Sequence, residues 1–413
     1  MTTMTRLSHL ADAPPRISAP PLRTADGHHR DERHASWLEL FFDLVFAGAV
    51  GQLTGALQDH PTLGTLARFG MLFVPVWWLW VQFAFYADRH ESDNALHRTA
   101  ILTAILACVG LAASAPRALA GDTTGFVIAF ASLRVLQLLL YARAWYTLPA
   151  TRPLYARYLV FFGTGGSLWV GSLAMPGQAR FAVWAAALAC DAAGAMAMVN
   201  PARRLPVNSA HLAERFQLFV LIVLGESVAR LISAATERPW SVPLGVILAA
   251  AVLILAGLWW AWLTAADPGA LDGMPAMVRF TALNLPVVAG IAAASAGLHI
   301  AILAAHSGGT IGIGPRAALY GGVGVYLMAT ALLPSDKLSR ARRLVRLATA
   351  LAAMALVFMG AFVVPVYLVP ALTAVLIAGL VAEGHAALRR QRRLADLSRP
   401  LLGGSASSAG TSG

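Results

Sequence analysis

An apolar run near the start of the chain contains two carboxylates four residues apart. The run begins Trp37-Leu-Glu39-Leu-Phe-Phe-Asp43-Leu-Val-Phe46 and continues to about residue 57. About twenty apolar residues in a helix cross the roughly 30 Å hydrocarbon layer of a bilayer. The spacing stacks Glu39 and Asp43 on one face of such a helix, one turn apart. Because a carboxylate in lipid is costly, we expect this face to meet a bundle interior, a wet cavity or a cation, and we interpret it as functional.

Composition places the chain among polytopic membrane proteins. Of its 413 residues, 58% are hydrophobic and only 12% are charged, unlike an ordinary soluble domain. Eleven more apolar runs follow the first, at about residues 66–87, 98–115, 123–142, 154–174, 179–199, 212–235, 242–265, 277–301, 314–333, 346–363 and 366–383. We therefore predict an all-α polytopic membrane protein with about twelve transmembrane helices. The last two runs are so close that they form either two helices or one broken segment.

The basic residues predict how the chain is oriented. A net charge of +11 would suggest a nucleic-acid partner for a soluble chain. Here most arginines flank the apolar runs, so we expect membrane lipid as a partner and no nucleic acid. We also expect an unidentified small molecule as a partner. If both termini are cytosolic, most Arg and Lys residues fall on the inner side, as the positive-inside rule requires. The expected localisation is the cell membrane, multi-pass, with both termini in the cytosol.

The two ends of the chain are polar. Residues 1–35 are rich in Pro, His and Arg, lack the apolar region of a signal peptide, and predict a disordered cytosolic arm. We interpret the histidines at the end of this arm as a polar collar beside the membrane, in preference to a metal site, because a flexible arm cannot hold ligands in fixed geometry. Residues 386–413, basic and then rich in Gly and Ser, predict a cytosolic tail. Neither a metal nor a cofactor is expected.

The second half of the sequence echoes the first at an offset of about 180 residues. The matching pairs are Glu39 with Glu214, Trp77-Trp78-Leu-Trp80 with Trp259-Trp260-Ala-Trp262, Asp88 with Asp267, and Arg98 with Arg279. Their common order predicts two six-helix repeats, residues 36–200 and 201–385. Because six is even, both repeats enter the membrane from the same side, as in transporters whose site lies between two halves. The alternative is that the helices merely share an Ala, Leu and Trp vocabulary.

Three motifs carry a resemblance to a known family. They are the run from Trp37 to Phe46, His211-Leu-Ala-Glu214-Arg215-Phe216, and Leu224-Gly225-Glu226-Ser227-Val228. With Trp259-Trp260, Asp93 and Arg98, and Pro286 and Gly290 in the expected order, the sequence from about residue 35 to 385 resembles the bacterial low temperature requirement A family. Members often carry a Tyr and a His shortly before the proline, where this chain has Leu283-Asn284-Leu285. The resemblance implies a multi-spanning membrane protein and brings no settled biochemical activity.

The candidate site consists of ionisable residues within the apolar runs. As proton or substrate-binding groups we select Glu39, Asp43, Arg134, Asp191, Glu214 and Glu226. Two crowded, desolvated carboxylates tend to hold one proton between them, so Glu39 and Asp43 are predicted to share a proton. The alternative is structural: Arg134 and Arg215 form salt bridges that lock helices together, with Arg215 close to Glu214. No catalytic residue is assigned.

Two further patterns have ordinary structural interpretations. The tryptophans at 77, 78, 80, 259, 260 and 262 are expected to anchor the chain at the membrane interface, in preference to stacking on a ligand. Gly51-Gln-Leu-Thr-Gly55 is a GxxxG motif, which is expected to pack the first helix closely against a neighbour.

These observations lead to three hypotheses about function. The first is a secondary transporter, coupled to protons, with the buried acids as proton or solute-binding groups. The second is an intramembrane enzyme for a lipidic or isoprenoid substrate, in which a carboxylic acid donates a proton and aromatic side chains stabilise cationic intermediates. The third is a membrane scaffold or sensor whose polar pairs are structural. Product formed in detergent would distinguish the second hypothesis from transport.

Overall fold

The computed structural model describes residues 35–90, 95–176, 179–203, 205, 207–304 and 309–403, with side chains described up to residue 389. The regular elements within these ranges are all helices. The predicted arm up to residue 34 and the Gly/Ser-rich tail from 404 lie outside the described residues.

The first half of the chain forms six long helices. They are α1 (Trp37–Asp59), α2 (Leu63–Arg89), α3 (Ala95–Ala120), α4 (Thr124–Thr147), α5 (Arg152–Gly171) and α6 (Ala179–Ala202), with short 3₁₀ turns η1 (Pro149–Thr151) and η2 (Ser172–Ala174). Local sequence fixes where α1 begins: the Ser36 side chain accepts from the Glu39 backbone N–H, and the Glu39 carboxylate accepts from the Ser36 backbone N–H. This reciprocal cap satisfies two N–H groups that a helix start otherwise leaves without partners.

The second half contains helices α7 to α13. They are α7 (Ser209–Thr236), α8 (Val242–Ala265), α9 (Gly273–Leu303), α10 (Ile313–Arg316), α11 (Gly322–Leu332), α12 (Arg340–Met359) and α13 (Pro365–Gly403), with η3 (Pro268–Ala270) after α8 and a π-helical turn, η5 (Ala317–Gly321), joining α10 to α11. The two runs at the end of the chain are therefore separate helices. They are divided by residues 360–364, and α13 continues through the first part of the predicted tail.

Nine of the helices in the described part of the chain are long and apolar enough to cross a membrane: α1, α2, α3, α4, α6, α7, α8, α9 and α13, the last over Pro365–Arg389. The expected all-helical, multi-pass architecture is confirmed at this level. Three predicted runs fall outside this set, namely α5, the broken helix α10–η5–α11, and α12, whose first two turns carry four arginines. The count of twelve spans stays a prediction.

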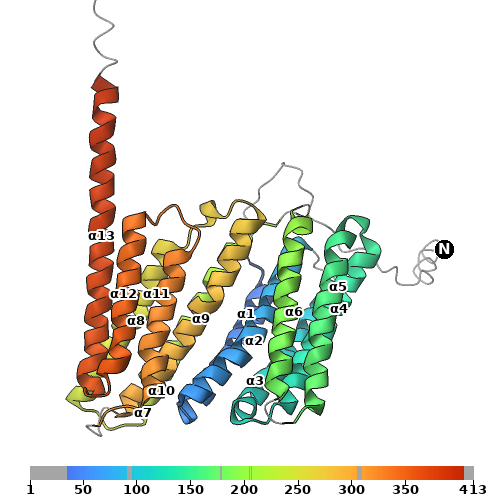
Figure 1. The fold of residues 1–413 in the computed structure, drawn as a ribbon, viewed down its shortest axis with the longest axis horizontal. Helices are drawn as coiled ribbons and strands as arrows, with labels where there is room; N and C mark the ends of the chain where they lie inside the picture. Colours follow the sequence, from blue (N-terminus) through green and yellow to red (C-terminus); the bar gives the residue numbers. More distant parts are fainter. Residues whose placement is uncertain are drawn as a thin grey trace, which may run out of the picture.

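Five helices of each half pack in the same order. The second helices differ, since α8 packs on α13 whereas α2 packs mainly on α1. In the first half α1 packs on α3, α3 on α4, α4 on α5 and α5 on α6. Counting α10–η5–α11 as one helix, the second half repeats this order from α7 through α9, α11 and α12 to α13. Figure 1 shows α4, α5 and α6 on one side of the molecule, α8, α12 and α13 on the other, and α1, α2 and α9 between them.

The first helices of the two halves meet each other. Helix α1 packs against α7, and both pack against α9; we call the α1–α7 contact the seam. Glu39 at the start of α1, Asp88 at the end of α2 and His211 at the start of α7 lie in one cluster. These three helix ends therefore share one end of the bundle, which we call the near end; the opposite one is the far end.

Candidate functional site at the near end of the seam

A cavity of about 670 Å³ lies at the near end, between α1, α2, α3 and α7. Its polar lining consists of Ser36, Glu39, His90, His97, Arg98 and Arg215. The remaining wall is apolar and includes Phe41, Phe42 and Phe83. Trp37 at its rim is 89% exposed and Phe41 is 48% exposed, so apolar side chains of α1 flank the opening. The cavity thus combines ionisable groups with a hydrophobic wall, as small-molecule sites do.

Arg215 joins the two halves at the floor of this cavity. From α7 its guanidinium donates to both oxygens of Asp43 on α1, at 2.5 Å from Nη2 and 3.2 Å from Nε. The indole N–H of Trp80 donates to Asp43 at 2.7 Å. Arg215 Nη1 lies 3.7 Å from the Glu39 carboxylate, which is too long for a hydrogen bond. The prediction that Glu39 and Asp43 share one face of a helix agrees with this arrangement, since both face the same arginine.

The two carboxylates that are predicted to share a proton, Glu39 and Asp43, have different surroundings. Asp43 is fully buried and accepts hydrogen bonds from one guanidinium and one indole. Glu39, by contrast, borders the cavity and faces a histidine as well as the arginine. Of the two carboxylates, Glu39 is therefore the one that reaches the cavity. A proton shared between Glu39 and Asp43 stays a prediction.

His211 stands between two carboxylates. Its Nδ1 lies 3.0 Å from Asp88 Oδ1, and its Nε2 lies 3.6 Å from Glu39 Oε2. A neutral imidazole can donate from one nitrogen only, whereas the protonated ring can donate to both acids. Asp88 is held in turn by the backbone N–H of Asn208 at 2.9 Å, just before α7. His211 thus pairs with Asp88, and its other nitrogen faces Glu39 at a distance longer than a hydrogen bond. We call these three residues the Glu39–His211–Asp88 triad.

His90, on the cavity wall directly after α2, has a different environment. Its Nε2 lies 2.7 Å from the hydroxyl of Tyr155, and the ring is buried. Burial lowers the pKa of His90 to about 3, and the positive charge of the adjacent Arg89 contributes. His90 is therefore a neutral hydrogen-bonding group in this site.

Two of the predicted residues form a pair elsewhere. Arg134 on α4 donates to Asp191 on α6 at 2.6 Å, and both side chains are buried. The same guanidinium donates to the side-chain oxygens of Gln82 at 2.9 Å and Gln137 at 3.3 Å. This is the structural arrangement that the alternative interpretation anticipated, and it lies inside the first half, away from the cavity lining.

The remaining two predicted residues are on α7. Glu226 pairs with Arg230 one turn later, at 2.9 Å, toward the far end of the seam. Glu214 is half-buried next to the buried Arg215. Arg215 forms a salt bridge between helices, as the structural interpretation expected. Its partner is Asp43 on α1 instead of the neighbouring Glu214, since residues one apart on a helix do not face each other.

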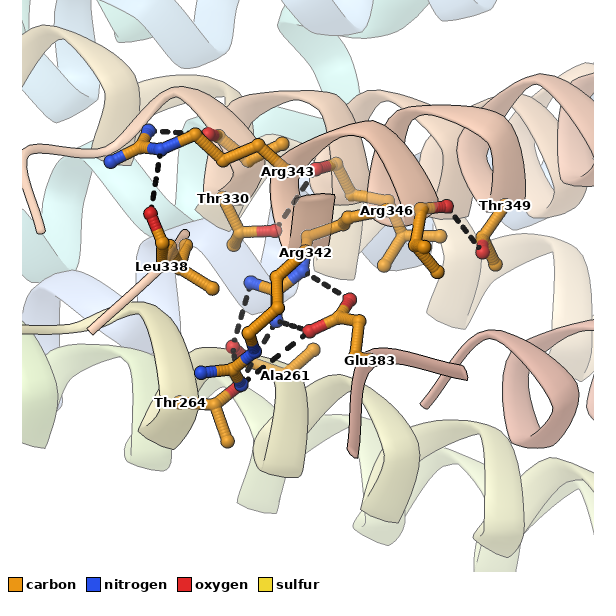
Figure 2. A network of polar contacts seen from close by, with 12 residues as sticks. Ala261, Thr264, Thr330, Leu338, Arg342, Arg343, Arg346, Thr349 and Glu383 are labelled. Atoms are coloured by element: carbon orange, nitrogen blue, oxygen red, sulfur yellow. Dashed lines mark hydrogen bonds and ion pairs between the residues drawn. The ribbon is translucent and has the colours of Figure 1, made fainter. Parts of the chain in front are cut away.

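The second half has a buried charge network of its own. Arg346 on α12 donates to both oxygens of Glu383 on α13, at 2.6 and 2.8 Å (Figure 2). It also donates to the Ala261 carbonyl at 3.1 Å and to the Thr264 hydroxyl at 3.0 Å, both on α8. All three guanidinium nitrogens are used, so this network ties α8, α12 and α13 together.

Several of these residues were not selected from sequence. Asp88 appeared there only as a repeat match, and His211 only inside a family motif, although both now flank Glu39. Arg230 could have been found from its spacing of four from Glu226. The expectation of interfacial tryptophans is wrong for Trp77, Trp80 and Trp262, which are buried in the core. Trp259 and Trp260 are exposed. Among the described residues, no group of three or more His, Cys, Asp or Glu side chains has the arrangement of a metal site.

Comparison with known proteins places this architecture in a family. An uncharacterized protein of Rhizobium meliloti (strain 1021) is 28% identical over 284 residues, which cover 63% of this chain and 68% of that protein. No solved structure matches the chain. Residues 34–382 match the family described as bacterial low temperature requirement A protein (LtrA), a range that includes the cavity, the seam and the Arg134–Asp191 pair. The chain therefore belongs to the bacterial low temperature requirement A family.

Proposed function

We propose that this protein is a proton-coupled secondary transporter of a small solute. One observation carries the proposal: a cavity of about 670 Å³ reaches the seam between the two halves, and its wall contains Glu39 and Arg215. The solute would enter this cavity at the near end. The proton would reside on the Glu39–His211–Asp88 triad, so that binding of the solute near Glu39 changes the affinity of the triad for the proton.

The packing order supports two six-helix repeats as the framework for transport. The same sequence of neighbours occurs in five helices of each half, and the first helix of each half packs against the other. In transporters built from such repeats the site lies between the halves, and rocking of one half against the other alternates access. The polar cluster at the seam occupies the corresponding position here.

The basic residues support an orientation for this proposal. The near end holds the loops and helix ends that carry most arginines, including Arg340, Arg342 and Arg343 at the start of α12. By the positive-inside rule the near end faces the cytosol of a cell-membrane protein. The cavity would then be open to the cytosol.

The test uses purified protein in sealed liposomes. The liposomes are placed in a small-molecule extract of bacterial cells, a pH gradient is imposed, and the contents are analysed by mass spectrometry. We expect at least one solute to move across the membrane with the wild-type protein, and to do so to a greater extent when the gradient is present.

Two variants make the result specific. Glu39→Gln should reduce gradient-dependent movement of the same solute about 100-fold. Glu237→Gln, the same substitution at an exposed residue after α7, should leave it unchanged. Liposome contents that are identical for wild type, Glu39→Gln and protein-free vesicles would refute the proposal.

A further inference from the structure

The far end of the seam is closed by a second charged pair. Arg230 extends from α7 to α1, where Nη2 donates to the backbone carbonyl of Gly51 and Nη1 lies 3.5 Å from the side-chain oxygen of Gln58. The same guanidinium holds Glu226 on its own helix at 2.9 Å. The backbone carbonyl of Arg230 lies 3.3 Å from His299 Nδ1 on α9. One arginine thus links the three central helices at this end.

Two glycines of α1 make room for this pair. A Cβ on Gly51 would lie 2.8 Å from a carboxylate oxygen of Glu226, and a Cβ on Gly55 would lie 3.0 Å from Arg230 Nη1. The GxxxG motif was expected to allow close approach of a neighbouring helix. In this seam it instead accommodates charged side chains, and the backbone carbonyl of Gly51 accepts a hydrogen bond from Arg230.

The Glu226–Arg230 pair lies at the far end of the seam and connects α7 to α1, as a gate between these helices would. Along the parallel helices of the seam, Asp43 pairs with Arg215 near the near end, and Gly51 meets Arg230 about 12 Å further along α1 at 1.5 Å per residue. The side chain of Glu226 is 40% exposed and that of Arg230 is 15% exposed, unlike the fully buried arginine pairs within each half. A partly exposed ion pair is weaker than a buried one and can open at a smaller cost.

We propose that Glu226 and Arg230, seated on Gly51 and Gly55, form the far-end gate of the seam. In the structure described here this gate is closed while the cavity at the near end is accessible. Opening would withdraw the Arg230 guanidinium from α1 and expose the face of α1 that carries residues 51, 54, 55 and 58. The inference rests on the proposed transport function for its purpose, but the gate can be tested without any solute.

The test measures access of a water-soluble maleimide to a cysteine on this face. Cys108 and Cys190 are replaced by Ala, and Thr54, which is 3% exposed and lies on the same helical face, is replaced by Cys. With Arg230 present, the new cysteine should react slowly. In Arg230→Gln the rate should rise about tenfold, because loss of a charge-assisted contact worth about 1.4 kcal/mol shifts the opening equilibrium by that factor.

Control variants separate gating from damage. Arg238→Gln changes the same charge at an exposed position after α7 and should not alter the rate. Asp59→Cys, exposed at the end of α1, should react rapidly in every background. If Arg230→Gln does not yield a folded, monodisperse protein, Glu226→Gln replaces it, because this variant keeps the bond to Gly51 and should give a smaller increase.

The outcomes distinguish the gate from the transport function. Unchanged protection of Thr54→Cys in folded Arg230→Gln or Glu226→Gln protein would overturn the gate. An increased rate in a protein that moves no solute in liposomes would retain the gate and remove the proposed function. An increased rate shared by Arg238→Gln would show a general loosening and would also overturn the proposal.

Discussion

The Arg346–Glu383 pair and the Arg215 cluster contain similar groups but differ in how fully their hydrogen bonds are made. Arg346 uses all three guanidinium nitrogens within one half, at 2.6 to 3.1 Å, and both partners are buried. At the seam, the contacts of Glu39 with Arg215 and His211 are 3.7 and 3.6 Å, beside a cavity. A saturated network resists rearrangement, whereas a looser one next to water can change partners. Burial of an acidic side chain is therefore weak evidence of function by itself, and its hydrogen-bond partners have to be considered as well.

We expect the Arg346–Glu383 pair to be required for stability. Arg346→Leu leaves Glu383 buried without its cation, so we expect a loss of about 3–5 kcal/mol in the free energy of unfolding. Thermal unfolding in detergent measures it. The double variant Arg346→Leu with Glu383→Leu should recover most of this loss, because neither charge remains buried. A single variant as stable as wild type would contradict the structural role.

At the seam, the opposite pattern is expected for Glu39→Gln. The amide keeps the shape of the side chain and loses its charge, so transport should fall about 100-fold, as for loss of a positioned proton-transfer group. Its thermal stability should change little, since a Gln side-chain oxygen can still accept the 2.8 Å capping hydrogen bond from the Ser36 backbone N–H, and the contacts with Arg215 and His211 are long. A stability loss as large as that of Arg346→Leu would place Glu39 with the structural pairs.

His90 also lines the cavity, but unlike Glu39 it has a short contact, at 2.7 Å, with the Tyr155 hydroxyl. Its pKa is lowered to about 3 in the folded protein, while an unfolded chain has a His pKa near 6.5. The unfolded state therefore binds more protons below about pH 6.5, and stability is lost as the pH falls, by at most about 2 kcal/mol at pH 5. Melting curves at pH 8 and pH 5 should show a smaller acid-induced drop for His90→Gln than for wild type. Equal drops would mean that His90 is not held neutral.

The smallest effect is expected for His211→Gln. The amide can hydrogen-bond to one carboxylate but cannot carry the proton, so transport should fall about tenfold and its dependence on external pH should flatten. Uptake rates measured in liposomes from pH 5.5 to 8.5 provide the test. A variant with an unaltered pH profile would remove His211 from the proton site and leave Glu39 alone in that role.

Helix positions were largely predictable because each span needs a long apolar run. Each predicted run overlaps a helix, although the broken helix from α10 to α11 could not be foreseen from hydropathy alone. The site was predictable only in part. The spacing of Glu39 and Asp43 correctly placed them on one face, but their partners Arg215 and His211 come from a helix about 170 residues later. Pairing of charges across a seam depends on the rotation of each helix, which the apolar pattern of a membrane span leaves undetermined.

The end of helix α13 provides a position for fusing a folded domain to the protein. The helix has 39 residues, of which Pro365–Arg389 are suited to the membrane, and in Figure 1 its end extends beyond the other helices. At 1.5 Å per residue, the part after Arg389 would project about 20 Å from the membrane surface. A folded domain fused in helical register at Gly403 would therefore stand at a fixed angle to the bundle. Such a fusion would give this small protein an external landmark for image alignment, without altering the seam.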